Sequence, residues 1–212
     1  MPDKSSQLAS IFSSFTRLCP PARFVVPVFH HSGKDLDDFA SAAAKIGLGN
    51  HPHGMVMEAA DRNLAVIRLQ EHPTLAEIVG LMYQVAQALH HLHQRGVLHG
   101  DVKPLNIVRT STRVYKLIDL DAAARISLDR AGRKYSSAFV PPEGMRAIIG
   151  LQSFPVAHPS WDVFSFGAML FELLTSTPLL PRNSRTDNIE ALEFKRMLCL
   201  WHGPTPGMLD KV

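Results

Sequence analysis

The chain has 212 residues, of which 46% are hydrophobic and 19% are charged, a composition typical of globular proteins and not of disordered ones. Its formal net charge is +3, and its Lys and Arg residues are scattered, which argues against a nucleic-acid surface. Two cysteines exclude a disulfide framework, and the longest apolar run, residues 163–174, is too short to cross a bilayer. We therefore expect a cytoplasmic protein that has no membrane span and binds no nucleic acid.

Short segments separated by proline and glycine are predicted in the first part of the chain. Residues 24–29 are mostly β-branched or aromatic and predict a strand, in which Pro27 indicates an edge or a bulge. The apolar spacing over residues 35–45 suits a short surface helix. Residues 54–58 predict a second strand.

The clearest helix is predicted for residues 74–95, where apolar side chains recur three and four residues apart on one face. Thr74 and Glu77 form a capping-box pattern at its start. Gly96 supplies the stop at its other end. This length and these caps predict a long surface helix with one buried face.

A hairpin and a buried helix are predicted farther along the chain. Residues 106–109 and 114–118 form two short β-prone runs around a turn, which would place Asn106 and Asp119 at adjacent corners. Residues 162–175 are apolar nearly all round, so we expect a central helix that is buried. Together these elements predict a mainly helical lobe with a small hairpin at its active edge.

Residues 99–119 hold the groups that ATP-dependent phosphoryl transfer to a hydroxyl requires. In this chemistry the protein places the acceptor in line and neutralises phosphate charge with a metal and cations. Asp101 can accept the proton of a substrate hydroxyl, and Lys103 can reach the transferred phosphate. Asn106 and Asp119 supply the oxygen ligands that suit Mg²⁺, which keeps several waters and uses few protein ligands.

Each of these residues alone has a simple explanation, because Asp and Asn are common in turns. The order His-x-Asp-x-Lys-x-x-Asn, followed by a hairpin and an Asp, would rarely arise by chance. With this set in place, the chain resembles the C-terminal lobe of a eukaryotic-type protein kinase. The matching segments are residues 99–106 for the H-R-D-L-x-x-x-N loop, 119–121 for D-F-G, 141–143 for A-P-E, 162–167 for the buried D-x-W-S-x-G helix and 55–60 for the strand and hinge.

The resemblance implies an α+β protein kinase-like fold, with a mainly helical C-lobe and a partial β N-lobe. Residues 1–60 would form a residual N-lobe and hinge, and residues 61–212 a C-lobe that is incomplete at its end. It implies an ATP-dependent serine/threonine protein kinase that uses ATP and Mg²⁺ and acts on a protein substrate.

The resemblance also implies roles for single residues. Asp101, Lys103 and Asn106 would be the catalytic residues, with Lys103 the phosphate-contacting lysine typical of serine/threonine kinases. Asn106 and Asp119 would hold the metal. Asp162 would support the backbone of the catalytic loop from below.

A second group of residues would hold the nucleotide if the resemblance holds. Met57 would be the gatekeeper, and Glu58 and Ala60 would belong to the hinge that binds adenine. Val108 would pack under the adenine ring, and Asp119 would approach the phosphates through the metal.

Three departures from the family pattern lie close to these residues. Gly100 replaces the arginine that in many kinases reads a phosphate on the activation segment, which implies activity without that phosphorylation. Asp121 replaces the glycine that makes the metal loop flexible, so a switching loop is not expected. Leu120 replaces Phe and still fills an apolar slot.

The upstream part departs further. The sequence has no G-x-G-x-x-G before Met57 and no Glu before Glu58, and its upstream lysines lie outside any V-A-I-K-like strand. We expect a truncated N-lobe, covered by a partner or belonging to a longer gene product. The alternative to an active kinase is a truncated pseudokinase that acts as a binding scaffold.

Other features have simpler interpretations. Near the C-terminal end, Glu143 lacks the late-helix arginine that pairs with it in kinases, and the candidate substitutes are Arg182, Arg185 and Arg196. The basic stretch 125–134 and the hydroxyls after it indicate a solvated loop, or a segment for substrate docking or phosphorylation. His90, His91 and His93 complement the dipole of the long helix, and zinc binding is not expected there.

Overall fold

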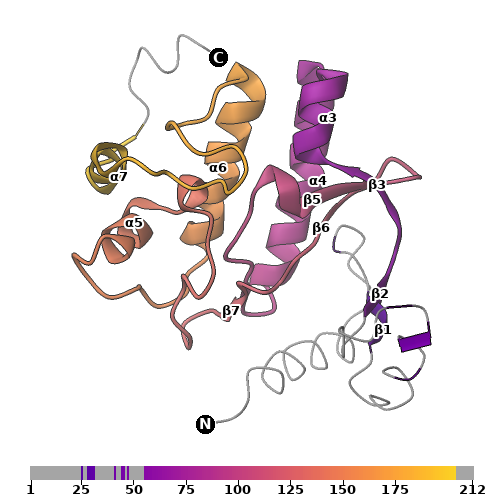
Figure 1. The fold of residues 1–212 in the computed structure, drawn as a ribbon, viewed down its shortest axis with the longest axis horizontal. Helices are drawn as coiled ribbons and strands as arrows, with labels where there is room; N and C mark the ends of the chain where they lie inside the picture. Colours follow the sequence, from indigo (N-terminus) through magenta and orange to yellow (C-terminus); the bar gives the residue numbers. More distant parts are fainter. Residues whose placement is uncertain are drawn as a thin grey trace.

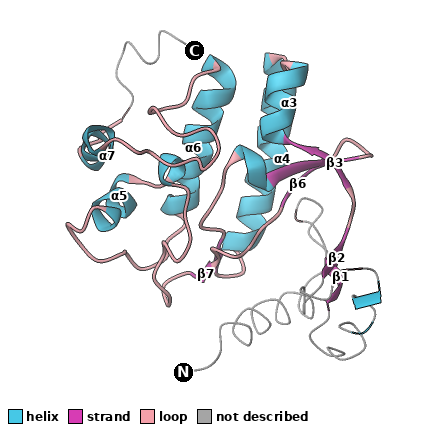
Figure 2. Cartoon of the chain, in the orientation of Figure 1, coloured by secondary structure: helices cyan, strands magenta, loops and turns pink. Residues whose placement is uncertain are grey.

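The computed structural model describes residues 55–203 without a gap, together with Val25, Val28–His31 and residues 41, 44, 45 and 47. In these ranges the chain forms a mainly helical body with small antiparallel sheets at one side (Figures 1 and 2). This arrangement confirms the predicted α+β class. Within the part of the chain that is described, no helix has the length and apolar character needed to cross a membrane.

Two strands stand apart from the helical body. β1 (Val28–His31) pairs antiparallel with β2 (Met55–Met57), and Figure 1 shows this pair to one side of the helices. Val25, three residues before β1, forms a bridge with Leu117 of the body. Of the strand predicted over residues 24–29, Val28 and Phe29 lie in β1, and residues 24, 26 and 27 lie outside the described residues. The helix predicted over residues 35–45 falls mostly outside the described residues.

A three-stranded sheet in the order β3-β5-β6 borders the body. β5 (Ile107–Thr110) and β6 (Tyr115–Leu117) are the predicted hairpin, now confirmed. β3 (Ala60–Asn63) pairs antiparallel with β5 and was not predicted, because only its first residue is apolar. Its position depends on partners elsewhere in the chain and not on a strand-like sequence.

Charge pairs fix β3 to its neighbours. The Arg109 guanidinium on β5 binds Asp61 on β3 and Glu71 at the end of α3 (Leu64–Glu71). The hydrogen bonds that Arg109 donates to Glu71 and then to Asp61 raise its pKa above its ordinary value. α3 begins directly after β3, where the Asn63 side chain accepts a hydrogen bond from the Val66 N–H at 3.0 Å.

α4 (Leu75–His93) is the long helix that the sequence predicts. The Thr74 N–H donates to Glu77 Oε2 at 2.8 Å, and the Glu77 N–H donates to Thr74 Oγ1 at 3.4 Å, so the capping box is confirmed. The chain leaves the helix through Gly96, whose φ is +72°. It then enters β4 (Val97–Leu98), which pairs with β7 (Ala124–Arg125) and leads directly to His99.

α6 (Ser160–Thr175) lies between α4 and the pair α5 (Pro142–Ile148) and α7 (Leu192–Cys199) (Figure 1). Trp161 and Met169 are fully buried on it, which confirms a central helix. Its burial is not complete, since Val163 is 60% exposed.

A buried ion network anchors α6 to the segment after it. Glu172 is 1% exposed and receives both terminal nitrogens of Arg182, at 2.7 and 2.8 Å. Arg68 from α3 lies 3.1 Å from the same carboxylate. Arg182 also binds Asp187 at 3.0 Å through Nε, so one guanidinium joins two acids.

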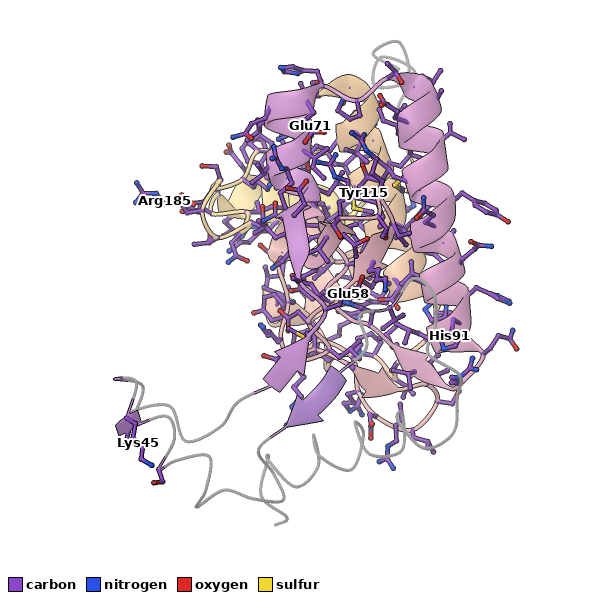
Figure 3. The ribbon with its side chains drawn as sticks, turned by 90° about the vertical axis from the view of Figure 1, so that its right-hand side faces the viewer. Lys45, Glu58, Glu71, His91, Tyr115 and Arg185 are labelled. Carbon is purple, nitrogen blue, oxygen red and sulfur yellow. The ribbon has the colours of Figure 1, made fainter. Side chains whose placement is uncertain are left out.

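This network shows that Arg182 does not replace the family's partner of Glu143. Glu143 is half-buried, and within residues 55–203 it makes no ion pair, although its backbone carbonyl accepts a hydrogen bond from Gln152. Figure 3 shows Arg185 pointing away from the body. The proposed pairings of Glu143 with Arg182, Arg185 or Arg196 are therefore wrong.

Removing Arg182 tests the buried network. Arg182→Met should lower the free energy of unfolding by about 3 kcal/mol, because the Glu172 carboxylate stays buried with only Arg68 near it. Urea denaturation measures the change. The matched control is Arg125→Gln, which removes the exposed pair with Asp129 and should leave stability close to wild type. Equal effects of the two variants would contradict the network's role.

Candidate active site

The loop between β4 and β5 is held to the end of β6 by a buried histidine. His99 Nε2 lies 3.0 Å from the carbonyl oxygen of Ile118, and His99 Nδ1 accepts the Asp101 N–H at 3.3 Å. These two bonds require the ring proton on Nε2. The side chain is fully buried, so it fixes the loop and does not meet substrate.

Asp162, at the start of α6, supports the same loop. Its carboxylate accepts the backbone N–H of His99 at 2.8 Å and that of Gly100 at 2.9 Å. His93 Nε2, from the last turn of α4, lies 2.8 Å from the same carboxylate. The role expected for Asp162 therefore matches its contacts, whereas His93 was interpreted only through the helix dipole. Only the folded contact between α4 and α6 identifies His93.

Gly100 has a backbone conformation that side chains rarely adopt. Its φ is +84°, and a Cβ built on it would lie 2.5 Å from the Ala122 carbonyl oxygen. The Gly100 carbonyl in turn accepts the indole N–H of Trp161 at 3.2 Å. Gly100 therefore does not only stand in place of the family's arginine. It also allows a backbone conformation that has no room for a side chain.

Asp101 presents one free carboxylate oxygen. Its Oδ2 lies 3.0 Å from Lys103 Nζ and accepts Asn106 Nδ2 at 3.2 Å. Its Oδ1 is buried and has no hydrogen-bond partner. A buried polar atom without a partner normally destabilises a fold, so such atoms often mark functional sites. An acceptor hydroxyl is a group that this oxygen could bind.

Lys103 joins the catalytic loop to the segment that precedes α5. Its Nζ donates to Ser136 Oγ at 2.6 Å while it contacts Asp101. Ser136 is 4% exposed and lies just before η3 (Ser137–Phe139). From the sequence, Ser136 has no role beyond that of a hydroxyl near a basic stretch, because its contact with Lys103 spans thirty-three positions of the chain.

Asn106 and Asp119 lie next to each other, as predicted. Asn106 ends η2 (Pro104–Asn106), and its carbonyl accepts the Ile118 N–H at 3.0 Å, one residue before Asp119. Asn106 Nδ2 donates to the Asp101 carbonyl at 2.8 Å. That bond turns the amide nitrogen inward and leaves Oδ1 as the atom that could meet a cation.

Asp119 adopts the left-handed region, with φ of +64°. Its carboxylate accepts the Asp121 N–H at 3.3 Å and lies 3.1 Å from Lys134 Nζ, which also contacts Asp121 at 3.3 Å. Burial lowers the pKa of Lys134, but the two carboxylates outweigh this effect and raise it. Because Lys134 bonds to these acids, part of the basic stretch is held by the site and is not simply solvated.

The residues expected at the nucleotide lie on three strands and on the link between two of them: Met57 on β2, Ala60 on β3, Val108 on β5 and Glu58 between β2 and β3. Glu58 binds Lys116 of β6, and Val108 is 8% exposed in β5 and pairs with Lys116. Figure 3 shows Glu58 where the outer strand pair joins the body. Ala60 pairs with Thr110 at the start of β3, whereas Met57 ends β2 and is 46% exposed. The structure therefore gathers Glu58 and Val108 at one sheet and leaves Met57 on the outer pair.

The metal that the sequence suggests agrees with this donor set. Asn106 Oδ1 and the Asp119 carboxylate are hard oxygen ligands, which suit Mg²⁺. Among the residues that the structure describes, no group of three or more His, Cys, Asp or Glu side chains is arranged to hold a metal ion.

Residues 46–205 match the family model of the protein kinase domain, which is more than half of the chain. The chain belongs to the protein kinase family. It is 37% identical over 125 residues to a Wee1-like protein kinase from Oryza sativa subsp. japonica, covering 58% of this chain and 22% of that protein. It is 34% identical over 136 residues to GLH-binding kinase 1 from Caenorhabditis elegans, covering 63% and 33%.

Structural similarity supports the same fold. The kinase chain matches the crystal structure of the yeast RNA Pol II CTD kinase CTDK-1 complex with a TM-score of 0.63 and 19% identity, covering 85% of this chain and 54% of that one. The predicted kinase-like fold is therefore confirmed. The chain spans 22% of the Wee1-like relative and 33% of GLH-binding kinase 1.

Gly100 offers a test of the loop geometry. Gly100→Ala should lower the free energy of unfolding by roughly 1 to 3 kcal/mol, because strain at positive φ adds to the contact with Ala122. The matched control is Gly96→Ala, since Gly96 has φ of +72° and a Cβ added there would meet no atom within 4 Å. Thermal denaturation of both variants measures the difference.

The same clash applies to the arginine of the family pattern. Gly100→Arg restores that arginine, yet it should destabilise the kinase at least as much as Gly100→Ala. A Gly100→Arg variant as stable as wild type would contradict the backbone geometry described for this loop.

Proposed function

We propose that this kinase chain transfers the γ-phosphate of ATP to serine or threonine hydroxyls of a protein. The observation that carries the proposal is the buried, unpartnered Oδ1 of Asp101. Lys103 and Asn106 occupy the other oxygen of the same carboxylate and so fix its direction. A hydroxyl that donates to Oδ1 would satisfy this atom and would be aligned for attack.

The proposed reaction needs little covalent chemistry from the protein. The acceptor oxygen bonds to the γ-phosphorus, the bond from phosphorus to the ADP oxygen breaks, and the hydroxyl proton moves to Asp101. Lys103 offsets charge on the transferred phosphoryl group, and Ser136 holds its ammonium in place. Preference for serine and threonine over tyrosine rests on Lys103, by resemblance to serine/threonine kinases.

ATP and Mg²⁺ use is general in this family. We assign Asn106 and Asp119 as the metal ligands, and Glu58, Ala60, Val108 and Met57 as nucleotide contacts. Bound Mg²⁺ would neutralise phosphate charge. Lys134 would release Asp119 when the metal binds, which is feasible because the lysine side chain is 48% exposed.

We propose the domain division at residues 1–60 and 61–212, supported by the separate position of β1 and β2 (Figure 1). The partner expected over the first of these parts stays a prediction, because most of residues 1–54 lie outside the described ranges.

Asp101→Asn tests the acceptor role. Phosphotransfer to a mixture of serine, threonine and tyrosine peptides should fall by about 100- to 10,000-fold, because the amide cannot take the hydroxyl proton. Binding of Mg-ADP should stay within a few-fold of wild type. The control is Asp129→Asn, an acid paired with Arg125 away from the loop. Undiminished transfer by Asp101→Asn would overturn the assignment.

Asp119→Asn tests the metal site. Saturating Mg-ADP, at about 100 times its dissociation constant, should stabilise the wild type by roughly 2.7 kcal/mol in thermal denaturation. In Asp119→Asn the magnesium-dependent part of this shift should disappear, whereas Lys134→Gln should retain it. A wild-type chain that shows no shift at millimolar Mg-ATP would favour the non-catalytic scaffold instead.

A further inference from the structure

The segment that carries Ser136 is bonded in its first part to a second stretch before α6. The Ser127 N–H donates to the Ala157 carbonyl at 2.9 Å, and the Ala157 N–H donates to the Asp129 carbonyl at 2.8 Å. The Ala131 N–H donates to the Pro155 carbonyl at 2.9 Å. These bonds pair residues 127–131 with residues 155–157 in an antiparallel manner.

An aromatic contact closes this pairing. Gly132 has φ of +76°, and a Cβ built on it would lie 2.1 Å from Phe154 Cδ1, so the Phe154 ring covers the glycine backbone. The ring centroids of Phe154 and Tyr135 are 5.9 Å apart. Phe154 therefore contacts the segment on both sides of the exposed pair Arg133 and Lys134.

Tyr135, which Phe154 contacts, is one residue before Ser136, the residue that binds Lys103 of the catalytic loop. Tyr135 precedes Ser136, whose hydroxyl receives Lys103 Nζ at 2.6 Å, and Lys103 lies 3.0 Å from Asp101. A shift of the segment at Tyr135 would carry Ser136 away from Lys103. Phe154 can thus act on the catalytic loop without touching it.

Two hydroxyls of the segment, those of Ser136 and Ser137, are already used inside the fold, whereas Ser127 and Tyr135 are exposed. Ser136 is 4% exposed and Ser137 is 2% exposed, and Ser137 Oγ accepts the Ile189 N–H at 2.8 Å. A phosphate on either residue would require the segment to open. In kinases with the family's arginine, a phosphate bound to that arginine orders this segment. In this chain, the backbone pairing with residues 155–157 and the contact of the Phe154 ring with Gly132 order it instead.

We propose that Phe154 is a positioning residue that, through Gly132 and Tyr135, holds the segment 127–137 closed and keeps Ser136 on Lys103 without phosphorylation. The catalytic consequence rests on the proposed function. The closure itself is a property of the fold and can be measured without nucleotide.

Limited proteolysis measures the closure. Trypsin cleaves after Arg133 and Lys134, which are exposed and adjacent to Gly132. When opening and closing are fast, cleavage tracks the open population. Gly132→Ala should speed cleavage at this site by about tenfold or more, because the added methyl collides with Phe154.

The chain offers a matched control in Gly150. Its φ is +80°, and a Cβ added there would have no atom within 4 Å. Gly150→Ala therefore introduces the same backbone strain without a collision, and cleavage after Arg133 and Lys134 should stay within about twofold of wild type. Equal acceleration by Gly132→Ala and Gly150→Ala would overturn the proposal.

A double variant tests whether the ring is the partner. Phe154→Ala should open the segment, and adding Gly132→Ala to it should accelerate cleavage little further, because the colliding ring is gone. Such non-additivity is the expected mark of a direct contact. Phe154→Tyr keeps the ring and should restore protection. Additive effects of Gly132→Ala and Phe154→Ala would overturn the contact as the cause.

Two further readouts separate positioning from general stability and from the proposed function. A merely structural role would speed cleavage at all sites together with a lower melting temperature, and this outcome would overturn the proposal. In phosphotransfer, Phe154→Ala should lower kcat while KM for ATP stays near wild type. If wild type transfers no phosphate, the proposed function fails, and the proteolysis results alone decide whether Phe154 closes the segment.

Discussion

The shape of the catalytic loop depends on one buried carboxylate. Asp162 is fully buried at the start of α6 and accepts the N–H groups of His99 and Gly100 as well as a contact from His93. A buried carboxylate is tolerated only when its oxygens are saturated with donors, so these three contacts must form together. They bring α4, α6 and the loop into one arrangement. The direction of Asp101, one residue later, follows from that arrangement.

The site is organised mostly by hydrogen bonds and close backbone packing. Gly100 turns its N–H to Asp162 and its carbonyl to Trp161, a conformation that a side chain would obstruct at Ala122. Gly132 also allows close packing, because the Phe154 ring lies against its backbone where a side chain would stand. In both places the lack of a side chain lets another element approach closely. Gly100 stands in place of the phosphate-reading arginine, and it lets the loop pack closely against Ala122 without that positive charge.

The sequence predicted what depends on neighbours along the chain. The helix that begins after Thr74 and the β5–β6 hairpin are local patterns, and the structure places them as expected. The order of Asp101, Lys103, Asn106 and Asp119 is also a local pattern. What it could not predict depends on distant partners. β3 is polar and forms because Arg109 and β5 bind it, Arg182 turns to Glu172 and not to Glu143, and the roles of His93, Ser136 and Phe154 appear only where remote segments meet. Neither the periodicity nor the spacing of residues in the sequence predicts these contacts between distant segments.

The metal loop and the substrate-facing segment are also joined by charge. The Asp121 N–H bonds to Asp119, and the Asp121 carboxylate, at the position that is glycine in the family pattern, shares Lys134 with Asp119. An exposed lysine pair of this kind contributes little to stability, so a divalent cation could displace it readily. Lys134 lies two residues after Gly132 and one before Tyr135, which are the two contacts of Phe154. Release of Lys134 by a metal would therefore remove one tie on a segment that Phe154 still holds, and Ser136 would remain on Lys103 while Asp119 exchanges its cation.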